Sequence, residues 1–122
     1  MSWTFSKEKS IYSQIVEHIK MCIISGEYKL GDKLPSVREL AVLAAVNPNT
    51  MQRALQELEK MELVFAKRTS GRFITEDKAM VDKLKENFAK KQIIDFYQKM
   101  KNIGLTKSEI INFVEKTFEE MN

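Results

Sequence analysis

Apolar residues near the start of the chain recur every three or four positions, which is the spacing of one face of an α-helix. They are Ile11, Ile15, Ile19, Cys22 and Ile23. Gly26 follows this pattern and can end a helix in the left-handed conformation. The pattern therefore predicts an amphipathic helix over residues 11–25. We expect Trp3 and Phe5, in the arm before it, to anchor that arm on the body of the protein.

Two further helix starts follow in close succession. Ser36 and Glu39 have the spacing of a capping box, which predicts a helix that begins near Val37. Asn47 can cap another helix whose first residue is Pro48, because proline has no amide to lose there. A short turn over residues 44–46 would join the two helices. This arrangement is typical of a helix-turn-helix, in which the opening residues of the second helix project outward.

A pair of short β-favouring segments comes next, at residues 63–66 and 72–75, around the polar stretch 67–71. Two such segments around a turn that contains glycine predict a β-hairpin. A hairpin directly after a helix-turn-helix is a wing. Its tip would carry Lys67, Arg68 and Arg72, which are all positive and can contact phosphates. The alternative is a small hairpin that closes the core and leaves a solvated tip. The uniform positive charge favours the wing.

Beyond residue 76 the pattern is helical only. Residues 77–102 contain no glycine or proline, Gly104 interrupts the pattern, and Thr106 with Glu109 predicts a capped last helix to about Met121. Residues 77–102 predict one long helix, whose apolar residues point in two directions. The apolar residues of the last helix cover an arc wider than one neighbouring helix can bury. We therefore expect a homodimer. The alternative is a monomer whose two stripes pack onto the winged domain.

The expected fold is mainly α with a small β-hairpin. Residues 1–75 would form an N-terminal winged helix-turn-helix, and residues 76–122 a C-terminal two-helix dimerisation hairpin. The residues expected in the dimer interface share an apolar character and lie on the two C-terminal helices; they are Ile93, Phe96, Tyr97, Met100, Ile110, Ile111, Phe113, Val114 and Phe118.

Charge is unevenly distributed along the 122 residues. The net charge is +3, and the excess belongs to residues 1–75, which hold 11 Lys or Arg against 8 Asp or Glu. All four arginines lie there, at Arg38, Arg53, Arg68 and Arg72. Guanidinium groups are the preferred partners of phosphate and guanine. The charge pattern therefore agrees with nucleic-acid binding by the N-terminal part.

The composition argues against a metal site, a nucleophilic enzyme and a membrane protein. A single histidine, His18, and a single cysteine, Cys22, do not supply the ligands of a zinc site or the groups of a nucleophilic catalytic site. We expect Cys22 to be a buried free thiol, and we expect no enzyme activity, no metal and no cofactor. No apolar segment approaches the roughly 20 residues of a membrane-spanning helix. A cytoplasmic protein without membrane function is expected.

The motifs together resemble the GntR family of bacterial transcription regulators. The resemblance is carried by Ile-Tyr-Ser-Gln-Ile at 11–15, Ile-Ile-Ser-Gly at 23–26, Gly-Asp-Lys-Leu-Pro-Ser-Val-Arg-Glu-Leu-Ala at 31–41, Val-Asn-Pro-Asn-Thr at 46–50, and by Ala54, Leu55, Leu58 and Glu59. The short two-helix tail resembles the YtrA-type subfamily. The resemblance implies a winged helix in residues 1–75, dimerisation by residues 76–122 and, commonly, control of transporter operons.

Four positions depart from the family pattern. Ser10 stands where proline usually precedes Ile-Tyr, and Glu62 replaces the glycine that usually follows the recognition helix. A turn at Glu62 must then be closed with strain at a residue other than glycine, or closed differently. Thr69 stands in place of the first glycine of the wing tip, which leaves only Gly71. Gln52 takes a place often held by arginine, and glutamine pairs best with adenine where arginine prefers guanine.

The resemblance also implies which residues touch DNA. Ser36 and Arg38 would contact phosphate or base at the start of the first helix of the motif, while Asn49, Thr50, Gln52 and Arg53 would read the major groove. Asn47 is expected mainly as a cap. The whole expected set is Ser36, Arg38, Asn47, Asn49, Thr50, Gln52, Arg53, Lys67, Arg68, Gly71 and Arg72.

These expectations favour a sequence-specific DNA-binding transcription regulator. We expect a dimeric repressor that binds a pseudo-palindromic operator in double-stranded DNA. The alternative is a winged-helix adaptor that binds proteins without sequence-specific DNA binding, and retention on heparin or DNA would separate the two. The sequence leaves open the operator sequence, the regulated genes, the existence of a small-molecule effector and the sign of regulation.

Overall fold

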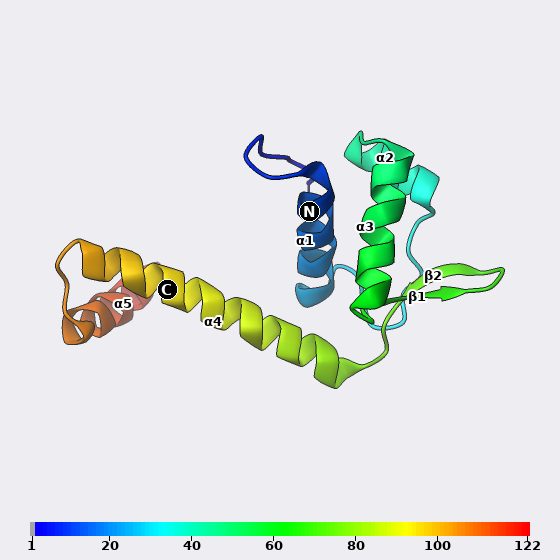
Figure 1. Ribbon diagram of the computed structural model, residues 1–122. Helices are drawn as coiled ribbons and strands as arrows, with labels where there is room; N and C mark the ends of the chain where they lie inside the picture. Colours follow the sequence, from blue (N-terminus) through cyan, green and yellow to red (C-terminus); the bar gives the residue numbers. More distant parts are fainter. Residues whose placement is uncertain (1) are drawn as a thin grey trace. The chain divides into compact units, whose positions relative to one another are not determined.

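The computed structural model describes residues 2–122 and is mainly helical, with one antiparallel pair of strands (Figure 1). The predicted fold class is confirmed. The chain divides into two compact units, of which the first extends to Lys83 and the second comprises Leu84–Asn122. Within the described residues, no helix is both long and apolar enough to cross a membrane.

Three helices build the first unit, and their ends are set by the capping residues that the sequence displays. They are α1 (Ile11–Ile24), α2 (Val37–Ala44) and α3 (Pro48–Lys60). The capping box of α2 is confirmed, because the Glu39 amide donates to Ser36 Oγ at 3.1 Å and the Ser36 amide donates to Glu39 Oε1 at 3.3 Å. At α3, Asn47 Oδ1 accepts from the Asn49 amide at 2.8 Å. The caps therefore fix where the recognition helix starts.

The turn between α2 and α3 is tight because one residue adopts a left-handed conformation. Ala45 has φ 55°, and the amide of Val46 donates to the carbonyl of Ala41 at 3.0 Å. A second left-handed residue, Glu62 with φ 62°, follows α3. The sequence left two alternatives for this turn, strain at a residue other than glycine or a different closure, and the structure has the first. The first turn ends α2 directly before α3, and the second turn follows the end of α3.

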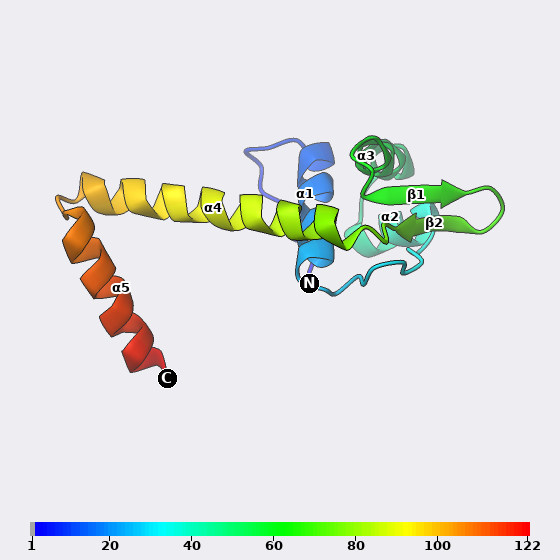
Figure 2. The ribbon, with the colours of Figure 1, turned by 90° about the horizontal axis from the view of Figure 1, so that it is seen from below.

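The wing is the hairpin of β1 (Val64–Lys67) and β2 (Gly71–Ile74), which run antiparallel in Figure 2. The predicted strands at 63–66 and 72–75 are each wrong by one residue. Lys67 pairs with Gly71, so the turn contains only residues 68–70, and the Ser70 amide closes it on the Lys67 carbonyl at 3.1 Å. Gly71, with φ 100°, continues the ladder in a conformation that a three-residue hairpin turn favours.

The core of the first unit lies where α1, α2 and β1 pack against α3. Its fully buried side chains include Ile15, Ile19, Leu40, Met51, Leu55, Leu58, Val64 and Ile74. Trp3 stacks on His18 of α1 with ring centroids 3.7 Å apart, so the predicted anchoring of the N-terminal arm is confirmed for this ring. Because α3 contributes Met51, Leu55 and Leu58 to this core, its opposite face is left to solvent.

Two helices form the C-terminal part, α4 (Lys78–Asn102) and α5 (Lys107–Met121). The predicted break and cap are confirmed, since Gly104 has φ 93° and Thr106 with Glu109 makes a capping box. From this turn α5 diverges from α4, as Figure 2 shows. Within the second unit only Ile110 is a buried hydrophobic residue. The second unit therefore has almost no core of its own.

Candidate nucleic-acid interface

The opening turns of α3 place polar side chains on the face away from the core. Asn49 and Arg53 are exposed, and Thr50 and Gln52 are half-buried. On the opposite face of the helix, Met51, Ala54 and Leu55 are buried, as the sequence predicted. The predicted groove readers thus share one surface, and the helix that carries them is held by the core beneath it.

Arg53 differs from its neighbours because its guanidinium lies over an aromatic ring of α1. Its Cζ is 4.2 Å from the centroid of the Tyr12 ring, a cation–π distance. Partial desolvation and a hydrogen bond to Glu57 raise the pKa of Tyr12, while Arg53 acts in the opposite direction. The phenol therefore stays neutral at physiological pH. This contact ties the predicted reader Arg53 to α1.

The start of α2 and the wing border one groove of about 420 Å³. Its lining includes Ser36, whose hydroxyl caps α2, and Lys33, Gly71 and Arg72. The backbone keeps these parts together, because the Leu34 amide donates to the Arg72 carbonyl at 2.8 Å. Two predicted contact regions, the start of α2 and the wing, are thereby brought together. Arg38, on the first turn of α2, is exposed.

The wing carries two positive charges, Lys67 and Arg68, at the outer end of the hairpin. Lys67 and Arg68 are exposed, and Lys67 Nζ lies 4.4 Å from the centroid of the Phe73 ring. A side chain at Gly71 would meet Lys33 Cε at 3.3 Å, and its φ of 100° strains any other residue. The hairpin therefore presents two cations to solvent, and glycine is the residue that fits position 71 without strain.

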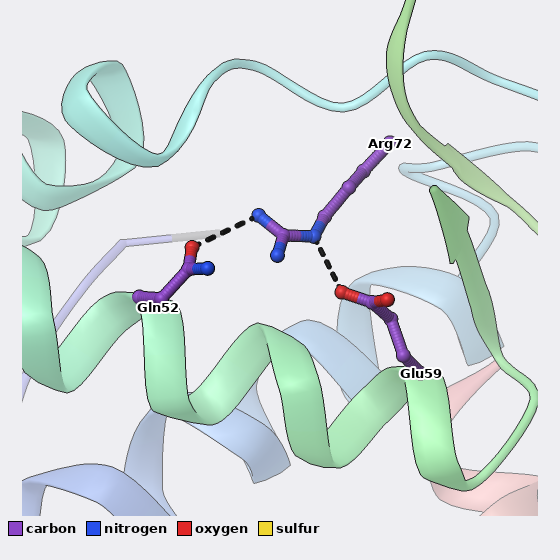
Figure 3. Close-up of polar contacts among 3 residues, drawn as sticks. All are labelled: Gln52, Glu59 and Arg72. Carbon is purple, nitrogen blue, oxygen red and sulfur yellow. Dashed lines mark hydrogen bonds and ion pairs between the residues drawn. The ribbon is translucent and has the colours of Figure 1, made fainter. Parts of the chain in front are cut away.

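Arg72 does not stand at the tip, where the sequence analysis placed it. It lies on β2 opposite Ala66 and is turned toward α3 (Figure 3). Its Nε donates to Glu59 Oε1 at 2.6 Å and its Nη1 donates to Gln52 Oε1 at 3.2 Å. The Arg72 side chain is 18% exposed. The wing and the recognition helix are thus joined by this contact.

Two residues of this surface were missed by the sequence analysis, namely Glu59 and Tyr12. Glu59 lies seven residues after Gln52, which puts both on one face of a helix, and this spacing could have indicated a shared partner. Tyr12 gave no comparable signal, because its meeting with Arg53 depends on the packing of α1 against α3. Each of them contacts a predicted DNA-contact residue, Glu59 at Arg72 and Tyr12 at Arg53.

The remaining candidate chemistry lies in α1. Cys22 is a buried free cysteine, as predicted, and burial raises the pKa of its thiol to about 12. Desolvation lowers the pKa of His18, which stacks on Trp3. Among residues 2–122, no group of three or more His, Cys, Asp or Glu side chains is arranged to hold a metal ion. Neither residue belongs to the polar surface of α3 and the wing.

A helix-turn-helix with an exposed polar recognition face and a basic hairpin defines the winged-helix class of proteins. The model of the family described as "Bacterial regulatory proteins, gntR family" matches residues 11–74. The chain belongs to the GntR family, which confirms the resemblance seen in the sequence. It is a DNA-binding transcription regulator.

Relatives extend the likeness beyond the matched segment. The chain is 42% identical over 116 residues to the uncharacterized transcriptional regulator YhcF of Bacillus subtilis, covering 95% of each chain. It is 45% identical over 67 residues to the transcriptional repressor YtrA of the same organism, which covers 55% of this chain and 52% of YtrA. The winged-helix part is therefore shared with a named repressor.

Solved structures agree with both units and with DNA binding. A GntR family transcriptional regulator from Listeria monocytogenes has a TM-score of 0.84 and 44% identity, covering 92% of this chain and 98% of that chain. The DNA-binding domain of AraR, solved in complex with operator ORX1, has a TM-score of 0.53 and 25% identity, covering 59% of this chain and 93% of that chain. Operator binding is thus seen directly in a structural relative of the first unit.

Proposed function

We propose that this regulator is a dimeric repressor that reads a pseudo-palindromic operator through α3 and grips the DNA backbone through α2 and the wing. The observation that carries the proposal is the polar face of α3 beside an exposed basic hairpin. In helix-turn-helix proteins, the N-terminal residues of the recognition helix contact base edges in the major groove. The likeness to the repressor YtrA supports the sign of regulation, and control of a transporter operon is part of the proposal.

The residues of this surface divide into two proposed roles. Asn49, Thr50, Gln52 and Arg53 are proposed to read bases, because side-chain amides, hydroxyls and guanidinium groups pair with base edges. Contacts to the DNA backbone are proposed for Ser36, Arg38, Lys67, Arg68 and Gly71, since phosphate contacts set the register of a protein on DNA. Asn47 is assigned to capping, because its side-chain oxygen already accepts the Asn49 amide. Arg72 is treated separately, because its guanidinium already contacts α3.

Gln52→Ala is expected to weaken specific binding by roughly 1–3 kcal/mol and to leave non-specific binding unchanged, as the loss of one base contact does. The measurement is the affinity for a duplex that wild-type protein has selected from a random pool, and for a scrambled duplex of the same composition. Gln92→Ala, an exposed glutamine of α4, serves as the control. Equal losses on both duplexes would remove Gln52 from the base readers.

Arg68→Ala is expected to reduce the slope of log affinity against log salt concentration by about 1, with specificity retained, because a phosphate contact acts through counterion release. Titrations of one duplex at several salt concentrations measure the slope. The matched control is Lys116→Ala, which removes one exposed positive charge from α5. A slope that stays at the wild-type value would place the wing tip outside the interface.

The second unit is proposed to form the dimer. Apolar side chains along α4 and α5 are exposed in the single chain, among them Ile93 at 63%, Phe113 at 57% and Phe118 at 60%. They border an open groove of about 620 Å³ between the two helices. An apolar surface of this kind marks an interaction site on a monomer. A second copy of the chain supplies a matching surface, because a two-fold interface uses the same patch on both protomers.

A small-molecule effector, where one acts, is proposed to bind at this same groove. Its volume exceeds the roughly 300 Å³ at which ligand pockets begin. Effector binding there would change the spacing of the two DNA-reading units. The test is thermal stabilisation of the protein by the compound, measured with and without a replacement of the groove residue Phe113. Stabilisation that is unchanged by the replacement would place the effector elsewhere.

A further inference from the structure

We infer that Arg72 is a positioning residue that fixes the orientation of the Gln52 amide, so that Gln52 reads DNA as a hydrogen-bond donor and favours guanine over adenine. This inference rests on the proposed role of Gln52 as a base reader. It assigns to Arg72 a task other than the phosphate contact expected of a wing arginine.

The orientation of the Gln52 amide follows from the chemistry of its partner. A guanidinium group only donates hydrogen bonds, so the atom of Gln52 that faces Arg72 Nη1 at 3.2 Å must be the oxygen. The nitrogen Nε2 is the other end of the amide, and within residues 2–122 the Gln52 side chain makes its hydrogen bond through Oε1 and none through Nε2. A side chain that could present either end to DNA is thereby held with its donor end available.

Arg72 is itself held in place. Its Nε donates to Glu59 Oε1 at 2.6 Å, and the side chains of Arg72 and Glu59 are 18% and 29% exposed. Gln52 and Glu59 lie two turns apart on α3, so one side chain from β2 reaches both (Figure 3). Because Glu59 already balances its positive charge, Arg72 has less charge to offer a phosphate than Lys67 or Arg68, which are exposed.

The held amide changes which base suits Gln52 best. A glutamine with both ends available pairs with adenine by accepting from N6 and donating to N7. Arg72 takes one of the two lone pairs of Oε1, so the N6 amino group would have to approach the remaining lone pair beside a positively charged guanidinium, which repels the amino hydrogens. Guanine presents two acceptors, N7 and O6, and both suit the Nε2 donor. The Arg72 contact therefore shifts the expected preference from adenine to guanine.

The test uses duplexes that each purified protein selects from a random-sequence pool. Gln52→Ala locates the base pair that Gln52 reads, since only there should the preference be lost. At that pair wild-type protein is expected to prefer guanine over adenine by about tenfold. Arg72→Met keeps the aliphatic bulk and removes the donors, so the preference should fall below about twofold or pass to adenine. In the Gln52→Ala background, Arg72→Met should change no base preference.

A second readout separates positioning from phosphate contact. Arg72→Met should leave the salt slope unchanged, whereas the loss of a phosphate contact lowers it by about 1. Glu59→Gln removes the ion pair and keeps Arg72, and it should weaken the guanine preference in the same direction. A thermal melt shows whether Arg72→Met folds. If it does not, Glu59→Gln still tests whether Arg72 positions Gln52. Arg72→Lys retains a donor and should keep part of the preference.

The outcomes distinguish this inference from the proposed function. A wild-type pool with no enriched sequence would refute sequence-specific binding itself. A Gln52→Ala pool identical to wild type would remove Gln52 from the readers and overturn the inference while DNA binding stands. An unchanged guanine preference in both Arg72→Met and Glu59→Gln, or a uniform loss of affinity with a shallower salt slope, would show that Arg72 does not position Gln52.

Discussion

Replacing Phe113 by glutamate is expected to convert the protein from a dimer to a monomer at micromolar concentration. Phe113 is 57% exposed in the single chain and borders the apolar groove of the second unit. A carboxylate there would have to be buried without a partner when two copies associate, which costs several kcal/mol. Light scattering coupled to size-exclusion chromatography measures the change in mass.

The loss of the dimer should also be visible on DNA. Two linked reading units gain about 10²-fold or more in affinity over one, so Phe113→Glu should weaken binding to a two-half-site operator by at least about 100-fold. Binding to random DNA should change far less. Asn112→Glu adds the same charge at the neighbouring exposed position, which does not line the groove, and should remain dimeric. A dimeric Phe113→Glu, or a monomeric wild type, would contradict the proposed interface.

Replacing Leu55 by alanine is expected to lower the free energy of unfolding by about 2–5 kcal/mol, as truncation of a buried leucine does. Leu55 is 1% exposed and lies on the buried face of α3. The same helix carries the proposed base readers, so DNA binding should be lost together with the fold as the temperature rises. Chemical denaturation at one fixed protomer concentration measures the change, because the stability of a dimer depends on concentration.

Gln56→Ala is the matched control for this prediction. Gln56 follows Leu55 in α3 and is exposed, so its truncation should change the free energy of unfolding by less than about 0.5 kcal/mol. A loss at Leu55→Ala as small as at Gln56→Ala would mean that α3 is not anchored by this core. The fixed position of the recognition surface would then need another explanation.

Local chemistry explains why the helices of this chain could be predicted from its sequence. Ser36 with Glu39, Asn47 with Pro48, and Thr106 with Glu109 each act within one turn of helix, so their effects are readable from neighbours alone. The polar face of α3 was also predictable, because it is the complement of the buried positions Met51 and Leu55. The ends of the two strands were harder to predict from the sequence, since the three-residue turn depends on how Gly71 pairs across the hairpin.

The contacts that define the candidate site could not be predicted in the same way. Arg72 meets Glu59 and Gln52 across 13 and 20 residues of sequence, and the contact exists only because β2 folds back beside α3. From the sequence, Arg72 was another cation of the wing tip. Likewise, the sequence predicts two apolar helices in the tail, but their divergence after Gly104 depends on tertiary structure.

The most direct test of a dimeric, sequence-reading regulator is a comparison of three duplexes. The first carries the sequence that wild-type protein selects from a random pool, the second is scrambled, and the third has five base pairs added between the half-sites, about half a helical turn. The account predicts an inverted repeat with half-site centres about 10 base pairs, or a multiple of that, apart. It also predicts binding to the first duplex at least about 100-fold tighter than to either of the others. Equal affinity for all three duplexes would contradict it.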